Sequence, residues 1–290
     1  MINFYLPDFF YKYNINTTIV ELLEEHPEYF KYENMKIAAF YGCFPNQIWN
    51  GGRTVKGQGA ELENIINTIN TINNYYKVPI RFTYTNCLIN EEHLGDEQCN
   101  IITSLAENGK NEILVNSPVL EKYLRESYPD FKYISSATRC VRDIDKLNEL
   151  INNEDYYLVL GDYRDNFNFE FLDKIQNKDK LEILINPYCK PDCQIRELHY
   201  KVLSQLQLNL PTEKDIHCPC ETMHWYELEQ SNHIIKSDDL QKYIDMGFSN
   251  FKIEGRNINV VDVVDSYVYY LIKPEYQNMV RNILLRNNFY

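Results

Sequence analysis

Four cysteines in one stretch of the chain are spaced as ligands of a metal centre could be. Cys189 and Cys193 are separated by three residues, and Cys218 and Cys220 flank a single proline. Four thiolates hold either zinc or an iron–sulfur cluster, and converging thiolates need sharply turning segments. Three prolines supply such turns: Pro187, Pro191 and Pro219. We therefore take these four cysteines as candidate metal ligands, with unconnected buried thiols as the alternative.

The spacing of these cysteines narrows the kinds of metal site. A zinc ribbon uses two C-x-x-C pairs, which this segment lacks. Arg196 occupies the position at which a C-x3-C-x2-C motif would have its third cysteine. Because two cysteines one residue apart bind a single cluster only in a tight geometry, Cys43 could replace Cys218 or Cys220 as the fourth ligand. We expect the other three cysteines to be ordinary core or loop residues: Cys87, Cys99 and Cys140.

The string FKIEGR, residues 251–256, combines a buried strand with charged side chains. Glu254 could move protons, Gly255 allows a sharp turn, and Arg256 offers a planar fork for a carboxylate or phosphate. The alternative is a structural ion pair that closes the sheet. Further charged residues follow other apolar runs. Arg139 and Asp162 are the remaining catalytic candidates, and Arg53 and Arg164 are candidate anchors for an anionic substrate.

Eight short apolar runs must position these side chains. They cover residues 2–6, 36–42, 80–86, 112–116, 132–138, 156–162, 181–186 and 251–254. The runs are apolar on both faces, as buried parallel strands are, and amphipathic stretches lie between them. This pattern predicts an α/β fold: a single (β/α)8 TIM-type barrel over residues 1–290, with the cysteine-bearing insertion between strands 7 and 8. An open doubly wound sheet is the alternative, but the first run is not followed by a Gly-rich phosphate loop.

Local signals predict where several helices begin and end. Thr18 with Glu21 has the spacing of a capping box, and a helix is expected over residues 60–75. Ser117 should cap a helix whose first residue is proline. A helix over residues 238–246 should end at a glycine, and the C-terminal region should be helical from about Asn259.

Composition limits the class of protein. The chain has 290 residues, of which 44% are hydrophobic and 24% charged, a balance typical of globular proteins. Its net charge of −13 disfavours a general nucleic-acid binder and makes RNA a less expected partner. No targeting segment and no apolar run of membrane-spanning length is present, so we expect a cytoplasmic protein that does not bind membranes. Disulfides would explain eight cysteines poorly there.

The strings FKIEGR and INPYCKPDCQIRELHY resemble the peptidase U32 family, as does the segment SDDLQKYIDMGFSN before the last apolar run. The resemblance implies a β/α barrel with a 4Fe–4S cluster on four cysteines. Several members carry out oxygen-independent hydroxylation of ubiquinone precursors or of RNA bases, and others are described as peptidases. Here the first two cysteines are closer together than in the hydroxylases, and C-P-C is not their pattern.

The resemblance therefore implies a 4Fe–4S enzyme for oxygen-independent hydroxylation, or a related redox modification, of a small anionic or biosynthetic substrate. One alternative is a U32-type peptidase or hydrolase that depends on zinc or a thiol and takes a peptide substrate. The other is a non-catalytic subunit that carries a cluster for a partner protein of the same family. Substrate identity does not carry over from the resemblance.

Overall fold

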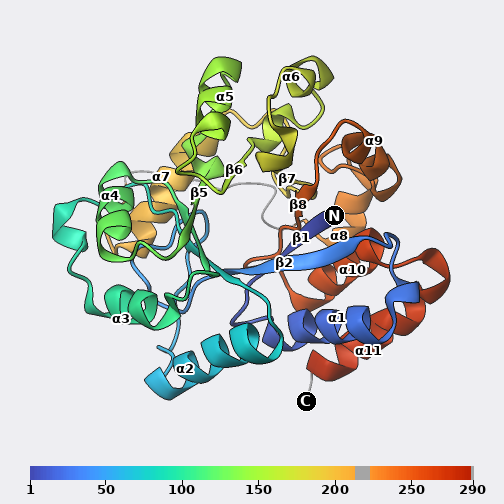
Figure 1. Cartoon of the computed structure of the whole chain (residues 1–290), viewed down its shortest axis with the longest axis horizontal. Helices are drawn as coiled ribbons and strands as arrows, with labels where there is room; N and C mark the ends of the chain where they lie inside the picture. Colours follow the sequence, from blue (N-terminus) through green and yellow to red (C-terminus); the bar gives the residue numbers. More distant parts are fainter. Residues whose placement is uncertain (213–222, 289–290) are drawn as a thin grey trace.

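Eight parallel strands close into a barrel in the computed structural model, which describes residues 1–212 and 223–288 (Figure 1). The strands are β1 (Ile2–Pro7), β2 (Met35–Gly42), β3 (Ile80–Tyr84), β4 (Glu112–Val115), β5 (Lys132–Ser135), β6 (Leu158–Leu160), β7 (Leu181–Leu184) and β8 (Asn250–Lys252). Each strand pairs with the next, and β8 closes the barrel on β1 with Phe251 opposite Phe4. The predicted TIM-type barrel is confirmed.

Helices surround the barrel (Figure 1). They are α1 (Tyr13–Glu25), α2 (Leu62–Asn70), α3 (Glu97–Ala106), α4 (Pro118–Ser127), α5 (Ile144–Asn152), α6 (Phe169–Asp173), α7 (Arg196–Gln207), α8 (Trp225–Gln230), α9 (Leu240–Asp245), α10 (Val260–Leu271) and α11 (Gln277–Asn288). Short 3-10 turns include η4 (Ala137–Arg139) and η5 (Tyr163–Asp165) at the ends of β5 and β6. The insertion between β7 and β8 contains α7, α8 and α9.

The inside of the barrel holds charged side chains beside its apolar ones. Successive residues of a strand face opposite sides, so each strand gives some side chains to the interior and others to the helices. Arg81 of β3 is fully buried and stacks 4.0 Å from the centre of the Tyr5 ring. Its guanidinium donates to Glu112 of β4 at 2.6 Å and to Glu182 of β7. Arg81 therefore links strands on opposite sides of the barrel.

The predicted cap at Ser117 is confirmed, and the capping box predicted at Thr18 is wrong. The Ser117 hydroxyl accepts from the Leu120 N–H at 3.3 Å, and Asn259 caps α10 in the same way. Thr18, by contrast, is buried inside α1, which begins five residues earlier. The helix starts early because the chain turns directly after β1, where Lys12 pairs with Asp8 at 3.2 Å. The carboxylate of Glu21 accepts from the Tyr76 hydroxyl instead.

Two other expectations need correction at their boundaries. The helix expected over residues 60–75 consists of α2 and a π-helical turn, η2 (Thr71–Tyr75). Strands β5 and β6 end before the polar residues assigned to them, because Ser136 and Asp162 cap the turns η4 and η5. Among the described residues no helix is long and apolar enough to cross a membrane.

Candidate active site at the mouth of the barrel

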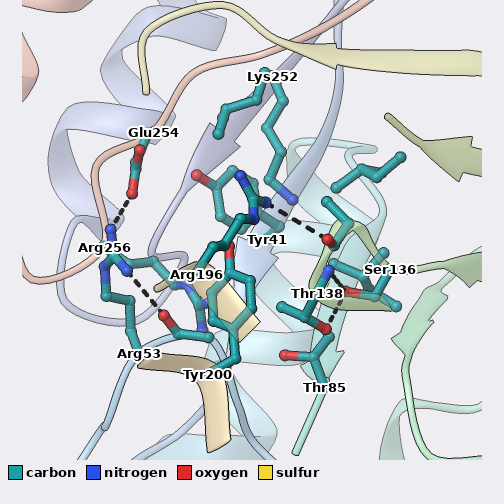
Figure 2. Close-up of a pocket in the computed structure, with 15 residues that line it drawn as sticks. Tyr41, Arg53, Thr85, Ser136, Thr138, Arg196, Tyr200, Lys252, Glu254 and Arg256 are labelled. Atoms are coloured by element: carbon teal, nitrogen blue, oxygen red, sulfur yellow. Dashed lines mark hydrogen bonds and ion pairs between the residues drawn. The ribbon is translucent and has the colours of Figure 1, made fainter. Parts of the chain in front are cut away.

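A pocket opens at the C-terminal ends of the strands, where barrels of this kind carry their active sites (Figure 2). Its volume of about 80 Å³ suits a small molecule or several waters. The lining residues are Tyr41, Gly52, Arg53, Thr85, Leu114, Ser136, Ala137, Thr138, Leu160, Leu184, Arg196, Tyr200, Lys252, Glu254 and Arg256. Four of these side chains are basic and one is acidic, the reverse of the balance of the whole chain.

Arg256 is held in place by neutral groups. Its Nη1 donates to Asn50 Oδ1 at 2.9 Å and to Thr83 Oγ1 at 2.8 Å, and its Nη2 donates to the Gly51 carbonyl at 3.0 Å. No carboxylate within the described part of the chain forms a salt bridge with it. The guanidinium is thus rigidly oriented, and its positive charge is not neutralised by a partner.

Two glycines make this arrangement possible. A Cβ on Gly255 would lie 2.5 Å from Pro7 Cγ, and a Cβ on Gly51 would lie 2.3 Å from the Thr85 carbonyl carbon. Real Cβ atoms do not approach other atoms so closely, so the backbone passes through both points only as glycine. The glycine of FKIEGR is therefore required by the close approach of β1.

Glu254 joins three segments at the rim of the pocket. One carboxylate oxygen pairs with Arg53, and the other accepts from the Tyr188 N–H at 3.1 Å. Its backbone N–H donates to Asn186 Oδ1 at 2.5 Å, and the Asn186 amide donates back to its carbonyl at 3.1 Å. Glu254 lines the pocket as predicted, but both of its oxygens already accept hydrogen bonds. This geometry favours a role in orienting Arg53.

Arg196 is a pocket residue that the sequence analysis did not select. It opens α7, is 4% exposed, and stacks 3.9 Å from the centre of the Tyr163 ring. Its Nη1 lies 3.4 Å from Asp162 Oδ1, yet Nη1 and Nε have no hydrogen-bond partner among the described residues. The Thr85 hydroxyl, on the same pocket wall, also has none. The sequence signal that could have identified Arg196 is its place soon after Cys189 and Cys193, at the start of a helix.

Lys252 is the second pocket residue that was missed. Its Nζ lies 3.8 Å from the centre of the Tyr41 ring and 3.7 Å from Glu182 Oε1. Burial lowers the pKa of Lys252 to about 7; Glu182 opposes this shift, and the positive charges of Arg81 and Arg256 add to it. Figure 2 shows the side chain entering the pocket beside Tyr41. The sequence placed Lys252 in the strand but gave it no chemical role.

Asp162 lies behind the pocket. It pairs with Arg164 at 2.8 Å, caps the turn η5, and lies against Arg196. Although burial acts to raise it, the pKa of Asp162 is lowered by hydrogen bonds from Arg164 and by the charge of Arg196. A carboxylate held in its charged form is a poor proton carrier, so its geometry favours a role in positioning Arg196. Arg164 also donates to the Cys193 carbonyl at 3.3 Å.

Arg139 is not brought to the pocket. Its Nη1 donates to the Tyr156 hydroxyl at 2.9 Å and its Nη2 to Glu121 Oε2 at 2.6 Å. Thr138, the preceding residue, lines the pocket, but Arg139 does not. The geometry gives no support to a substrate-binding role for Arg139 there.

Cys189 and Cys193 lie in the turn between β7 and α7, and both are partly buried. Burial raises the pKa of Tyr200 to about 12; the cations Arg196 and Arg53 oppose the shift, and Cys189 adds to it. The thiol of Cys189 is therefore a neighbour of pocket residues. Cations nearby stabilise thiolates, which is the form that binds metal.

The complete metal site is not part of the described structure. Cys218 and Cys220 lie outside the described residues. Among the residues that are described, no three His, Cys, Asp or Glu side chains are grouped to hold a metal ion. Cys43 is thus not brought to Cys189 and Cys193, and it is deeply buried: burial raises the pKa of its thiol to about 12, against the effect of Arg256. The structure does not support Cys43 as the replacement ligand.

The fold and the pocket define a (β/α)8 barrel protein with a cationic cavity at its mouth. No family model matches the chain, and no curated protein matches it. It is similar to a solved structure described as the U32 peptidase Mk0906, with a TM-score of 0.51 and 12% identity over 88% of this chain and 93% of that chain. The expected resemblance to a U32 peptidase is thereby confirmed at the level of the fold.

Proposed function

We propose that the chain is an iron–sulfur redox enzyme that binds a small anionic substrate at the mouth of the barrel. Oxygen-independent hydroxylation, or a related redox modification, is the proposed reaction. The observation that carries the anionic substrate is Arg256, whose charge faces the pocket with only neutral hydrogen-bond acceptors around it. An anion bound beside it would supply the missing counter-charge.

The chain's own residues then have distinct roles in binding. Arg256 and Arg196 would contact the anion. Lys252, the last residue of β8, lines the same pocket. Glu254 would fix the direction of Arg53, and Asp162 would fix that of Arg196. The apolar side chains of Leu114, Leu160 and Leu184 would exclude water from the remaining wall.

The cluster is the second part of the proposal. Cys189 and Cys193, with Cys218 and Cys220, would hold a 4Fe–4S group, which when bound supplies electron transfer. The described residues fit such a group in part: three residues separate the two cysteines, and Cys189 lies near cationic pocket residues, which would offset the negative charge of a ligating thiolate. Zinc is the alternative metal for the same four thiolates.

Metal analysis of anaerobically purified protein tests the cluster. We expect a brown protein with about four iron and four sulfide per chain, lost in Cys189→Ser and Cys193→Ser. The matched control is Cys87→Ser, because Cys87 lies in the loop after β3, where its backbone N–H donates to Ser204. A colourless protein without iron would refute the cluster.

The metal analysis also separates the alternatives. The second candidate is a zinc- or thiol-dependent hydrolase, which the description of the fold neighbour as a peptidase favours. Stoichiometric zinc in place of iron would select it. A stable cluster whose activity appears only when a second protein is added would select a cluster-bearing partner subunit, the remaining alternative.

A further inference from the structure

The amine of Lys252 is unusual among the basic groups of the pocket. The side chain is 8% exposed, and within the described part of the chain Nζ donates no hydrogen bond. The nearest carboxylate oxygen, Glu182 Oε1, is 3.7 Å away and has no hydrogen-bond partner itself. A buried ammonium group normally donates its three N–H groups to acceptors, because burying an unpaired charge costs free energy. Lys252 therefore sits where the positive charge of its ammonium form is poorly compensated.

The charges around Lys252 also disfavour its protonated form. The side chains that face it are Tyr41, Arg81, Glu182, Glu254 and Arg256. Two of them are cations, and each carboxylate already has an arginine partner: Glu182 pairs with Arg81, and Glu254 pairs with Arg53. With its pKa lowered to about 7, a large part of Lys252 is unprotonated at neutral pH. A neutral amine has a lone pair and is a nucleophile.

The pocket in front of this amine fits a small carbonyl acid. Arg256 and Arg196 supply cationic forks for a carboxylate, and hydroxyls of Thr85, Ser136 and Thr138 line the same cavity. The cavity of about 80 Å³ excludes bulky ligands. A compound with a carbonyl next to its carboxylate would place an electrophilic carbon in the pocket that Lys252 enters.

We propose that Lys252 forms an imine with a small 2-oxo carboxylate bound in the pocket. The amine nitrogen attacks the carbonyl carbon and forms a C–N bond, the carbonyl oxygen takes up the protons and leaves as water, and a C=N bond remains. No oxidant or reductant takes part. This inference rests on the anion-binding half of the proposed function and is independent of the cluster.

Reductive trapping tests the imine on the native chain. Full-length protein is incubated with pyruvate and cyanoborohydride near pH 7.5, digested, and mapped by mass spectrometry. We expect saturable carboxyethylation of Lys252, at least about tenfold above that of any other lysine, because an ordinary lysine with a pKa of about 10.4 is almost wholly protonated at this pH. The matched control within the same digest is Lys31, which is also partly buried with a lowered pKa but donates to Ser237 and the Tyr269 carbonyl outside the pocket.

The probes separate the parts of the proposal. Acetone, which lacks the carboxylate, should leave Lys252 unmodified at the same concentration; equal labelling by acetone would overturn the assignment of a 2-oxo acid. Pyruvate that binds by calorimetry without labelling Lys252 would overturn the imine and leave the anion site intact. Absence of both binding and labelling would overturn the imine and count against the proposed anionic substrate as well.

Discussion

Replacing Lys252 with methionine should change how the stability of the protein depends on pH. The folded-state pKa of Lys252 is about 7, against about 10.4 for a lysine in an unfolded chain. Between these values the unfolded state binds one more proton than the folded state, so this lysine makes the free energy of unfolding rise with pH. Its unfavourable contribution is complete below pH 7 and disappears as the pH approaches 10.4.

The size of the effect follows from the shift. One pKa unit corresponds to about 1.4 kcal/mol, so a shift of about three units costs ~4–5 kcal/mol at pH 7, where the lysine must be either buried with its charge or neutralised. We expect Lys252→Met to gain stability relative to the native chain at pH 7. The gain should shrink by ~1.4 kcal/mol for each unit of pH up to about 9.5.

Urea unfolding at several pH values measures this difference. Comparing the two proteins cancels the buried thiols and tyrosines, whose raised pKa values lower stability at alkaline pH in both. Lys122→Met is the matched control, since the side chain of Lys122 is 79% exposed, and its effect should not vary with pH. A difference between Lys252→Met and the native chain that stays constant from pH 7 to 9.5 would refute the reasoning.

Three other changes are expected to have measurable effects. Arg256→Gln should weaken the binding of pyruvate about 10–100-fold by calorimetry, through loss of a charged contact, while Arg139→Gln should leave it unchanged; equal losses would contradict the placement of Arg139 outside the pocket. Gly255→Ala should cost ~1–3 kcal/mol in urea unfolding because its Cβ meets Pro7, whereas Gly59→Ala, with open space around it, should cost little. Arg81→Met should cost ~3–5 kcal/mol because Glu112 and Glu182 lose their partner, and adding Glu182→Gln should restore part of the loss; a neutral single variant would argue against this ion pair.

The elements of the barrel could be predicted because each strand lies in a largely apolar run, and such runs need both faces covered. The Ser117 cap was equally predictable, since a cap depends on residues a few positions away. The prediction from Thr18 was wrong because Thr18 and Glu21, which have the spacing of a capping box, both lie inside α1. The turn after β1 sets the start of this helix.

The site was predicted less completely than the fold. Glu254 and Arg256 line the pocket as expected, because their string ends a strand. Arg139 also follows a strand, but the turn η4 directs it toward Glu121. The roles of Arg196 and Lys252 depend on Asp162 and Glu182, which are far away in the sequence, and the pairing of β7 with β6 and β8 brings these residues together.

The buried ion pairs also act as a mechanical brace. Strands β3 and β7 are four strands apart in the closed barrel, so the bond from Arg81 to Glu182 spans the lumen from one wall to the other. An ion pair between opposite walls opposes deformation of the barrel cross-section. Lys252 of β8 contacts the carboxylate of Glu182 as well. Formation of an imine at Lys252 would therefore change the surroundings of Glu182, and through this carboxylate those of Arg81 on the opposite wall.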